Sequence, residues 1–346
     1  MRRLLCFLII LFALALPVSA ADFTAPTAPE SAEDLMPADT ESFAEGVWQI
    51  LTEALTLLHP EIAKAGRICL SLIAILLLIS MLKHFPGDKG YVVEFAAAVG
   101  VGAVLLSHSN TLIRLGSQTV TELSEYGKLL LPVMTGALAA QGGTTSAAAL
   151  YAGTAAFDAV LCSLIGNVLV PMVYMFLALA AAAAATGVDG VGKLKSLVKW
   201  LTSWALKLVL YGFTGYMGIT GAVSGTADAA AVKAAKVTIS SMVPVVGGIL
   251  SDASETVIVG AGVVKNAAGI YGVLAALAIW ITPFLQIGLQ YLMLKLTGAV
   301  CSVFDLKRVS GLIEDFSSAM GVLLGMTGTV LVLLLVSTVC FMKVVA

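Results

Sequence analysis

The stretch from Ile68 to Leu82, ICLSLIAILLLISML, decides the class of fold. Its fifteen residues are apolar apart from two serines; Lys64 and Arg67 precede it, and Lys83 and Lys89 follow it. As a helix it is about 22 Å long, whereas the hydrocarbon core of a bilayer is about 30 Å thick. We therefore expect a membrane-spanning helix whose flanking cations snorkel to the interface, or which neighbouring helices wrap.

Further apolar stretches bring the predicted number of membrane spans to about seven. They run from Tyr91 to Leu106, Ala147 to Ile165, Val168 to Ala185, Trp200 to Val223, Gly269 to Phe304 and Ala319 to Phe341. Pro283 lies near the middle of the stretch from Gly269, which is therefore one kinked helix or a hairpin. The predicted fold class is an all-α, polytopic integral membrane helix bundle with broken or re-entrant segments.

The overall composition excludes several classes of protein. Apolar residues from the set AVILMFWYC make up 59% of the 346 residues and charged residues only 12%, whereas a soluble domain carries about 25% charged residues. A net charge of -2 without a basic block excludes nucleic-acid binding through phosphate neutralisation. The expected surroundings are the lipid bilayer and other membrane proteins.

The N-terminus predicts an exported segment before the membrane domain. Arg2 and Arg3, the apolar run Leu4–Leu16 and a small-residue site ending at Ala20 predict a cleavable signal peptide over residues 1–20. Residues 21–63 hold nine acidic residues and no lysine or arginine, so we expect an extracytoplasmic linker and amphipathic helix there, with the N-terminus outside the cytoplasm after cleavage. Residues 64–346 form the predicted multi-span domain. Its cytoplasmic loops are predicted at Lys83–Lys89 and around Lys193, Lys195 and Lys199.

Glycines three or four residues apart form a stripe along one predicted span, and we call them the α-helical glycine stripe. Residues at this spacing share a helix face, and small residues let two helices approach closely in a membrane. The stripe predicts a packing face, either inside the chain's own bundle or between subunits. Its members are Gly212, Gly215, Gly218, Gly221 and Gly225.

Two segments predict interrupted helices. Leu129–Ala140 is apolar but short, contains Pro132 and is followed by a glycine pair, which favours a half-helix that returns to its own side of the membrane. Val237–Asn266 is the stronger case, because a proline and two glycines are followed by two acids, an apolar turn and a lysine. These charges either lock a re-entrant hairpin as an ion pair or line a polar conduit. The candidate residues are Pro244, Gly247, Gly248, Asp252, Glu255, Lys265 and Asn266.

The run from Lys233 to Gly272 includes AAKVTISSMVPVVGGILSDASETVIVGAGVVKNAAGIYG and resembles the signature of the stage III sporulation protein AE family. The stretch Leu131–Met134 and the spacing of the later spans also fit that family. The resemblance implies a multi-pass protein of the mother-cell membrane around the forespore. It implies a component of the channel, or feeding tube, that sustains late forespore gene expression, with an extracytoplasmic ring and a separate cytoplasmic ATPase as partners.

Motifs for enzyme chemistry are weak. Gly187–Lys193 satisfies the GxxxxGK pattern of a phosphate-binding loop, but Leu194 replaces the required serine or threonine and an alanine run replaces the preceding strand. This pattern predicts a helix C-cap followed by a basic turn. His59, His84 and His108 are far apart, so we expect no metal site, no cofactor and no enzyme activity.

One alternative of another class stays open at the level of sequence. Broken helices build the substrate sites of secondary transporters, so the chain is either a channel subunit or a permease that binds substrate near Val237–Asn266. Solute movement by the purified chain would favour the permease, and loss of forespore gene expression alone would favour the channel.

Overall fold

A computed structural model describes residues 26–37, 42–83, 90–242, 247–303 and 306–343. Within these ranges the chain is helical and holds no strand, which confirms the predicted all-α class. The elements are α2 (Glu30–Glu33), α3 (Phe43–Lys83), α4 (Gly90–Ala140), α5 (Thr144–Leu164), the π-helical turn η1 (Ile165–Leu169), α6 (Val170–Thr186), α7 (Asp189–Met242), α8 (Gly247–Val303) and α9 (Lys307–Lys343).

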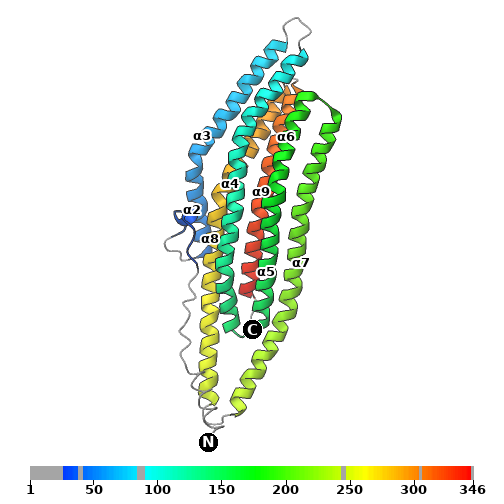
Figure 1. Ribbon diagram of the computed structural model, residues 1–346. Coiled ribbons are helices and arrows are strands. Elements are labelled where there is room, and N and C mark those ends of the chain that lie inside the picture. The colour runs from blue at the N-terminus through cyan, green and yellow to red at the C-terminus, as the bar shows by residue number, and fades with distance from the viewer. Residues whose placement is uncertain (1–25, 38–41, 84–89, 243–246, 304–305, 344–346) are drawn as a thin grey trace.

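The long helices run alternately up and down (Figure 1). At the upper end of that view α3, α6 and α8 end, while α4, α7 and α9 begin. α5, η1 and α6 follow one another without a turn, so they act as one rod. α9 contacts α4, α5, α6, α7 and α8, and is therefore the central helix of the bundle.

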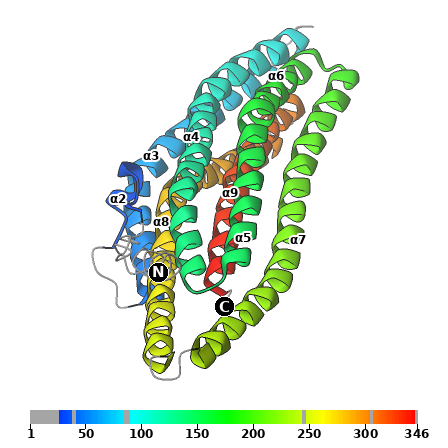
Figure 2. The ribbon, with the colours of Figure 1, turned by 60° about the horizontal axis from the view of Figure 1, so that its bottom comes forward.

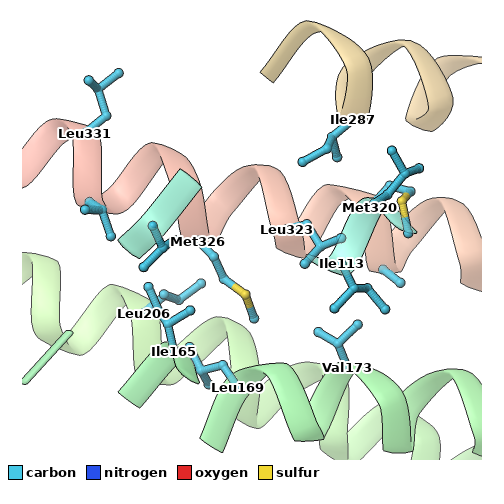
Figure 3. Packing of buried hydrophobic residues seen from close by; sticks show 14 of the residues in the cluster. Ile113, Ile165, Leu169, Val173, Leu206, Ile287, Met320, Leu323, Met326 and Leu331 are labelled. Carbon is cyan, nitrogen blue, oxygen red and sulfur yellow. The ribbon is translucent and has the colours of Figure 1, made fainter. Parts of the chain in front are cut away.

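Side chains around α9 form the apolar core (Figure 3). Leu323 and Met326 of α9 lie among Ile113 of α4, Leu206 of α7 and Ile287 of α8, and all five side chains are buried. A helix that is apolar on all sides is expected in the middle of a bundle, and the sequence of α9 from Ala319 has this character.

Five helical runs are long and apolar enough to cross a membrane, within the described part of the chain. The predicted number was about seven, and two differences account for it. The predicted spans Ala147–Ile165 and Val168–Ala185 belong to the single run Thr144–Thr186, and α7, which holds Trp200–Val223, is not among the five. Its lysines, glycines and hydroxyl side chains lower the mean hydropathy of its described residues.

Prolines sit inside these helices without ending them. Leu129–Ala140, predicted as a half-helix, is instead the last part of the 51-residue helix α4, which passes through Pro132 and ends at the Gln141–Gly143 turn. Pro283 likewise lies inside α8, which decides for one helix over a hairpin. Pro171 follows the π turn η1. Proline has no backbone N–H to donate, and the altered hydrogen-bond spacing of a π turn accommodates it. Packing against neighbouring helices makes such prolines tolerable in membranes.

Several helices are longer than a bilayer is thick. α7 has 54 residues and α8 has 57. At a rise of about 1.5 Å per residue each is more than 80 Å long, against about 40–45 Å for a bilayer with its headgroups. Part of the α7–α8 hairpin must therefore project from the membrane. Figures 1 and 2 agree on which part, because the end where α7 and α8 meet reaches past both the α4–α5 turn and the end of α9.

Candidate functional site

The predicted broken segment lies at the projecting end of the α7–α8 hairpin. α7 ends at Met242 and α8 begins at Gly247, with Gly248 in its first turn, whereas Pro244 lies outside the described residues. The helices thus stop on either side of the proline. The polar-conduit role of this segment stays a prediction.

Beyond Gly247 the backbone corrects the expected geometry. Asp252, Glu255, Lys265 and Asn266 all belong to the single helix α8, and no turn separates the acids from the lysine. Ten residues of helix place Glu255 and Lys265 about 15 Å apart along the axis. A hairpin closed by an ion pair between them is therefore wrong, because the chain does not turn back between these positions.

Lys265 lies where α8 packs against the last part of α4. Its side chain is 2% exposed, whereas that of the next residue, Asn266, is exposed. Burial of a lysine in a helix bundle is costly unless polar groups surround it, and Gln141, 9% exposed, belongs to the same region of α4 and α8. The structure thus brings Lys265 of the candidate set into the bundle interior.

Three glycines beside Lys265 make this close packing possible, and we call Gly262, Gly269 and Gly272 the α8 glycine face. A Cβ atom added at Gly262 would come within 2.6 Å of Gln141 Nε2, and one at Gly272 within 2.5 Å of Leu130 Cδ2. At Gly269 it would come within 2.5 Å of the sulfur of Met342 in α9. Sequence reasoning missed this face, although its spacings of seven and three residues are helical.

The α-helical glycine stripe behaves differently within the chain. A Cβ atom at Gly212 would touch Phe157 of α5 at 3.5 Å, but none at Gly215 or Gly218 would meet any atom within 4 Å. The structure does not describe what surrounds Gly221 and Gly225. α7 packs on its neighbours through a different row that includes Phe213. A packing role for the stripe therefore stays a prediction, and at Gly215 and Gly218 no partner lies among the described residues.

Charged side chains join four helices at the end where α7 and α9 begin, and we call this the cation-rich end. Lys195 Nζ of α7 lies 2.6 Å from Asp315 Oδ2 of α9. Arg308 Nε of α9 lies 3.5 Å from Glu94 Oε2 of α4, and Lys295 Nζ of α8 lies 3.9 Å from Glu314 Oε1 of α9. These pairs supply the compensation that charges beside apolar segments need.

Asp158 of α5 is compensated by hydrogen bonds. Ser124 Oγ of α4 donates to Asp158 Oδ2 at 2.6 Å, and Cys162 Sγ, one turn away, donates to Oδ1 at 3.7 Å. Its 9% exposure places the carboxyl between α4 and α5. This arrangement links two helices.

The GxxxxGK pattern is a helix cap. Gly187 ends α6 in the left-handed conformation, with φ of 68°, and its amide donates to Ala183 O at 2.9 Å. α7 then begins at Asp189. The predicted C-cap is therefore confirmed, whereas the predicted basic turn is wrong, because Lys193, Lys195 and Lys199 lie inside helix α7. In the described ranges no three His, Cys, Asp or Glu side chains gather to hold a metal ion.

Comparison with known proteins assigns the family. A model of the family described as stage III sporulation protein AE matches residues 32–344. The chain belongs to the stage III sporulation protein AE family. The stage III sporulation protein AE of Bacillus subtilis (strain 168) is 25% identical over 195 residues, which are 56% of this chain and 49% of that protein. The chain thus spans about half the length of this curated relative, and no solved structure matches it.

The family match extends well beyond the run Lys233–Gly272. It begins in α2 and extends to the end of α9, so it includes residues 32–63 of the acidic segment as well as the membrane bundle. Both the α8 glycine face and the cation-rich end lie inside the stage III sporulation protein AE match.

Proposed function

We propose that this chain is a membrane subunit of the channel that connects the mother cell with the forespore during endospore formation. The observation that carries the proposal is the family match over residues 32–344. Five apolar helices that fit a membrane and helices longer than a bilayer support a subunit that works by assembly on both sides of a membrane.

The proposed orientation places the cation-rich end in the cytoplasm of the mother cell. Positive charge on short loops favours the cytoplasmic side, and Lys193, Lys195, Lys307 and Arg308 all lie near that end. The projecting end of the α7–α8 hairpin would then lie outside the cytoplasm, on the same side as the acidic N-terminal segment. A cytoplasmic ATPase would meet the cation-rich end, and an extracytoplasmic ring would meet the hairpin.

The function is tested by deleting the gene in its sporulating host and following two forespore reporters. We expect loss of late forespore gene expression, with early forespore expression intact, and restoration by the full chain. Normal late expression in the deletion strain would overturn the proposal. Solute movement by the purified chain in vesicles would favour the permease instead.

The orientation is tested with single cysteines after replacement of the native ones. A cysteine at position 251, near the projecting end, should react with a membrane-impermeant maleimide in intact cells that express the chain without sporulating, where the extracytoplasmic side faces the medium. A cysteine at the exposed Ser196, near the cation-rich end, should react only after the membrane is opened. The reverse pattern would overturn the orientation and leave the family assignment intact.

A further inference from the structure

A cleft of about 460 Å³ lies between α7, α8 and α9 near the cation-rich end. Three lysines line it: Lys199 and Lys207 from α7 and Lys295 from α8. Lys199 and Lys207 are eight residues apart, so with Ser203 between them they share one face of α7. No acidic residue lines the cleft, which therefore presents concentrated positive charge.

The charges of these lysines are only partly compensated. Lys199 Nζ donates to the neutral hydroxyl of Ser318 at 3.0 Å. Among the described residues no carboxylate forms a salt bridge with Lys199 or Lys207, although the carboxylate of Asp315 interacts electrostatically with Lys199. The carboxylate of Glu314 lies 3.9 Å from Lys295, and the two side chains are 61% and 44% exposed. An anion in the cleft would meet three ammonium groups, none of which lies closer than 3.9 Å to a carboxylate oxygen of the described residues.

Much of the remaining lining of the cleft consists of apolar side chains and of glycines. Leu206, Leu210 and Val322 line it, and Gly321 and Gly325 of α9 form its floor. A Cβ atom at Gly325 would lie 3.8 Å from Leu206 Cδ1, so the missing side chains leave this space open. The site thus combines cations and hydroxyls with an apolar surface, as a ligand with a phosphate and a hydrocarbon part requires.

We propose that this cleft binds an anionic phospholipid, with its phosphate held by Lys199, Lys207 and Lys295 and its acyl chains along Leu206, Leu210 and Val322. Basic pockets between membrane helices bind such headgroups on the cytoplasmic side. A free phosphate compound shares the anionic chemistry but would leave the apolar wall uncovered, and the volume suits a headgroup with the first part of its chains. The proposal does not rest on the channel function.

The test uses native mass spectrometry of the purified full chain in mild detergent. The probes are dioleoylphosphatidylglycerol and dioleoylphosphatidylcholine, which share their acyl chains and differ in net charge. The wild-type chain should retain the anionic lipid at least tenfold better than the neutral one. The triple variant K199Q/K207Q/K295Q should lose this preference, whereas K128Q/K193Q/K343Q, with the same change in charge at exposed lysines outside the cleft, should keep it.

Two further measurements keep the proposal open to refutation. Gly325→Leu fills the apolar floor and should lower retention several-fold with all cations intact; the single variant Lys207→Gln should do the same if Gly325→Leu does not fold. Equal retention of both lipids by the wild-type chain, or an unchanged preference in the triple variant, would overturn the site. Displacement of the lipid by millimolar glycerol 1-phosphate would overturn the assignment to a lipid.

Discussion

At the cation-rich end Lys195 meets Asp315 and Arg308 meets Glu94 across helices, whereas towards the other end α8 touches its neighbours through Gly269 and Gly272, which have no side chains. In the first region, oppositely charged side chains form ion pairs between neighbouring helices. The second is joined by backbones that lie side by side. In a membrane, where lipid is as apolar as leucine, close contact and polar pairing are the two available means of holding helices together.

The largest expected effect comes from a substitution in the second region, where α8 packs through its glycines. Gly272→Leu places a side chain where even a Cβ atom would lie 2.5 Å from the fully buried Leu130, so either the Leu130 side chain or α8 itself must shift. Overpacking of this kind costs about 1–3 kcal/mol or more. The yield of monodisperse protein and its melting temperature should fall sharply. Gly100→Leu is the control, since Gly100 of α4 is exposed with no atom nearby, and equal behaviour of both variants would refute the close packing.

A smaller loss is expected at the cation-rich end. Asp315→Asn removes the charge that meets Lys195 at 2.6 Å, where the two side chains are only 22% and 18% exposed. Hydrogen bonds to charged groups contribute roughly 1.5–3 kcal/mol, so the melting temperature should drop measurably. Its neighbour provides the control: Glu314→Gln acts on a 3.9 Å pair with a 61% exposed carboxylate and should cost less than about 1 kcal/mol. The same loss in both variants would show that these pairs are not what joins the helices.

A third substitution sharpens the comparison at the cap that connects α6 with the cation-rich end. Gly187→Ala forces a side chain into a φ of 68° and against the Arg308 guanidinium, 2.9 Å from the new Cβ atom. The left-handed conformation alone costs about 1–2 kcal/mol. Gly192→Ala, in the helix of α7 with open space around it, should be neutral or slightly stabilising. Thermal unfolding of the two variants checks this, and a nucleotide-binding loop would instead require both glycines.

The smallest effect on the chain itself is expected on the outer face of α7. Gly218→Leu meets no atom within 4 Å, so the melting temperature of the isolated chain should stay unchanged. If the α-helical glycine stripe packs against another subunit, the same variant should lower the amount of chain that copurifies with its complex from sporulating cells. Loss of the folded monomer would show that the stripe packs inside the chain, and an unchanged complex would show that it faces lipid.

The sequence predicted helices well because apolar periodicity needs only local information. It did not predict their continuity: Pro132 and Pro283 look like interruptions, but surrounding helices hold both segments helical. The count of spans was affected at Ile165–Leu169, where a π turn joins the two predicted spans Ala147–Ile165 and Val168–Ala185.

Glycine spacing was informative about close approach but not about its partner. Gly212–Gly225 and the α8 glycine face both have helical spacing, yet the described contacts favour the second, since which helix lies opposite depends on the whole bundle. The sequence did not predict the cleft either. Lys207 and Lys295 are distant in sequence, and only the packing of α7 and α8 on α9 brings them together.

The length of α8 has a mechanical consequence. A helix is stiff along its axis, and α8 runs unbroken for 57 residues from the projecting tip to the cation-rich end. If α8, about 86 Å long measured along the helix, moves as one body, a tilt of about 5° about one end displaces the other end by up to about 7.5 Å. A partner that pushes one end of α8 on one side of the membrane would thus displace the other end of α8 laterally on the opposite side.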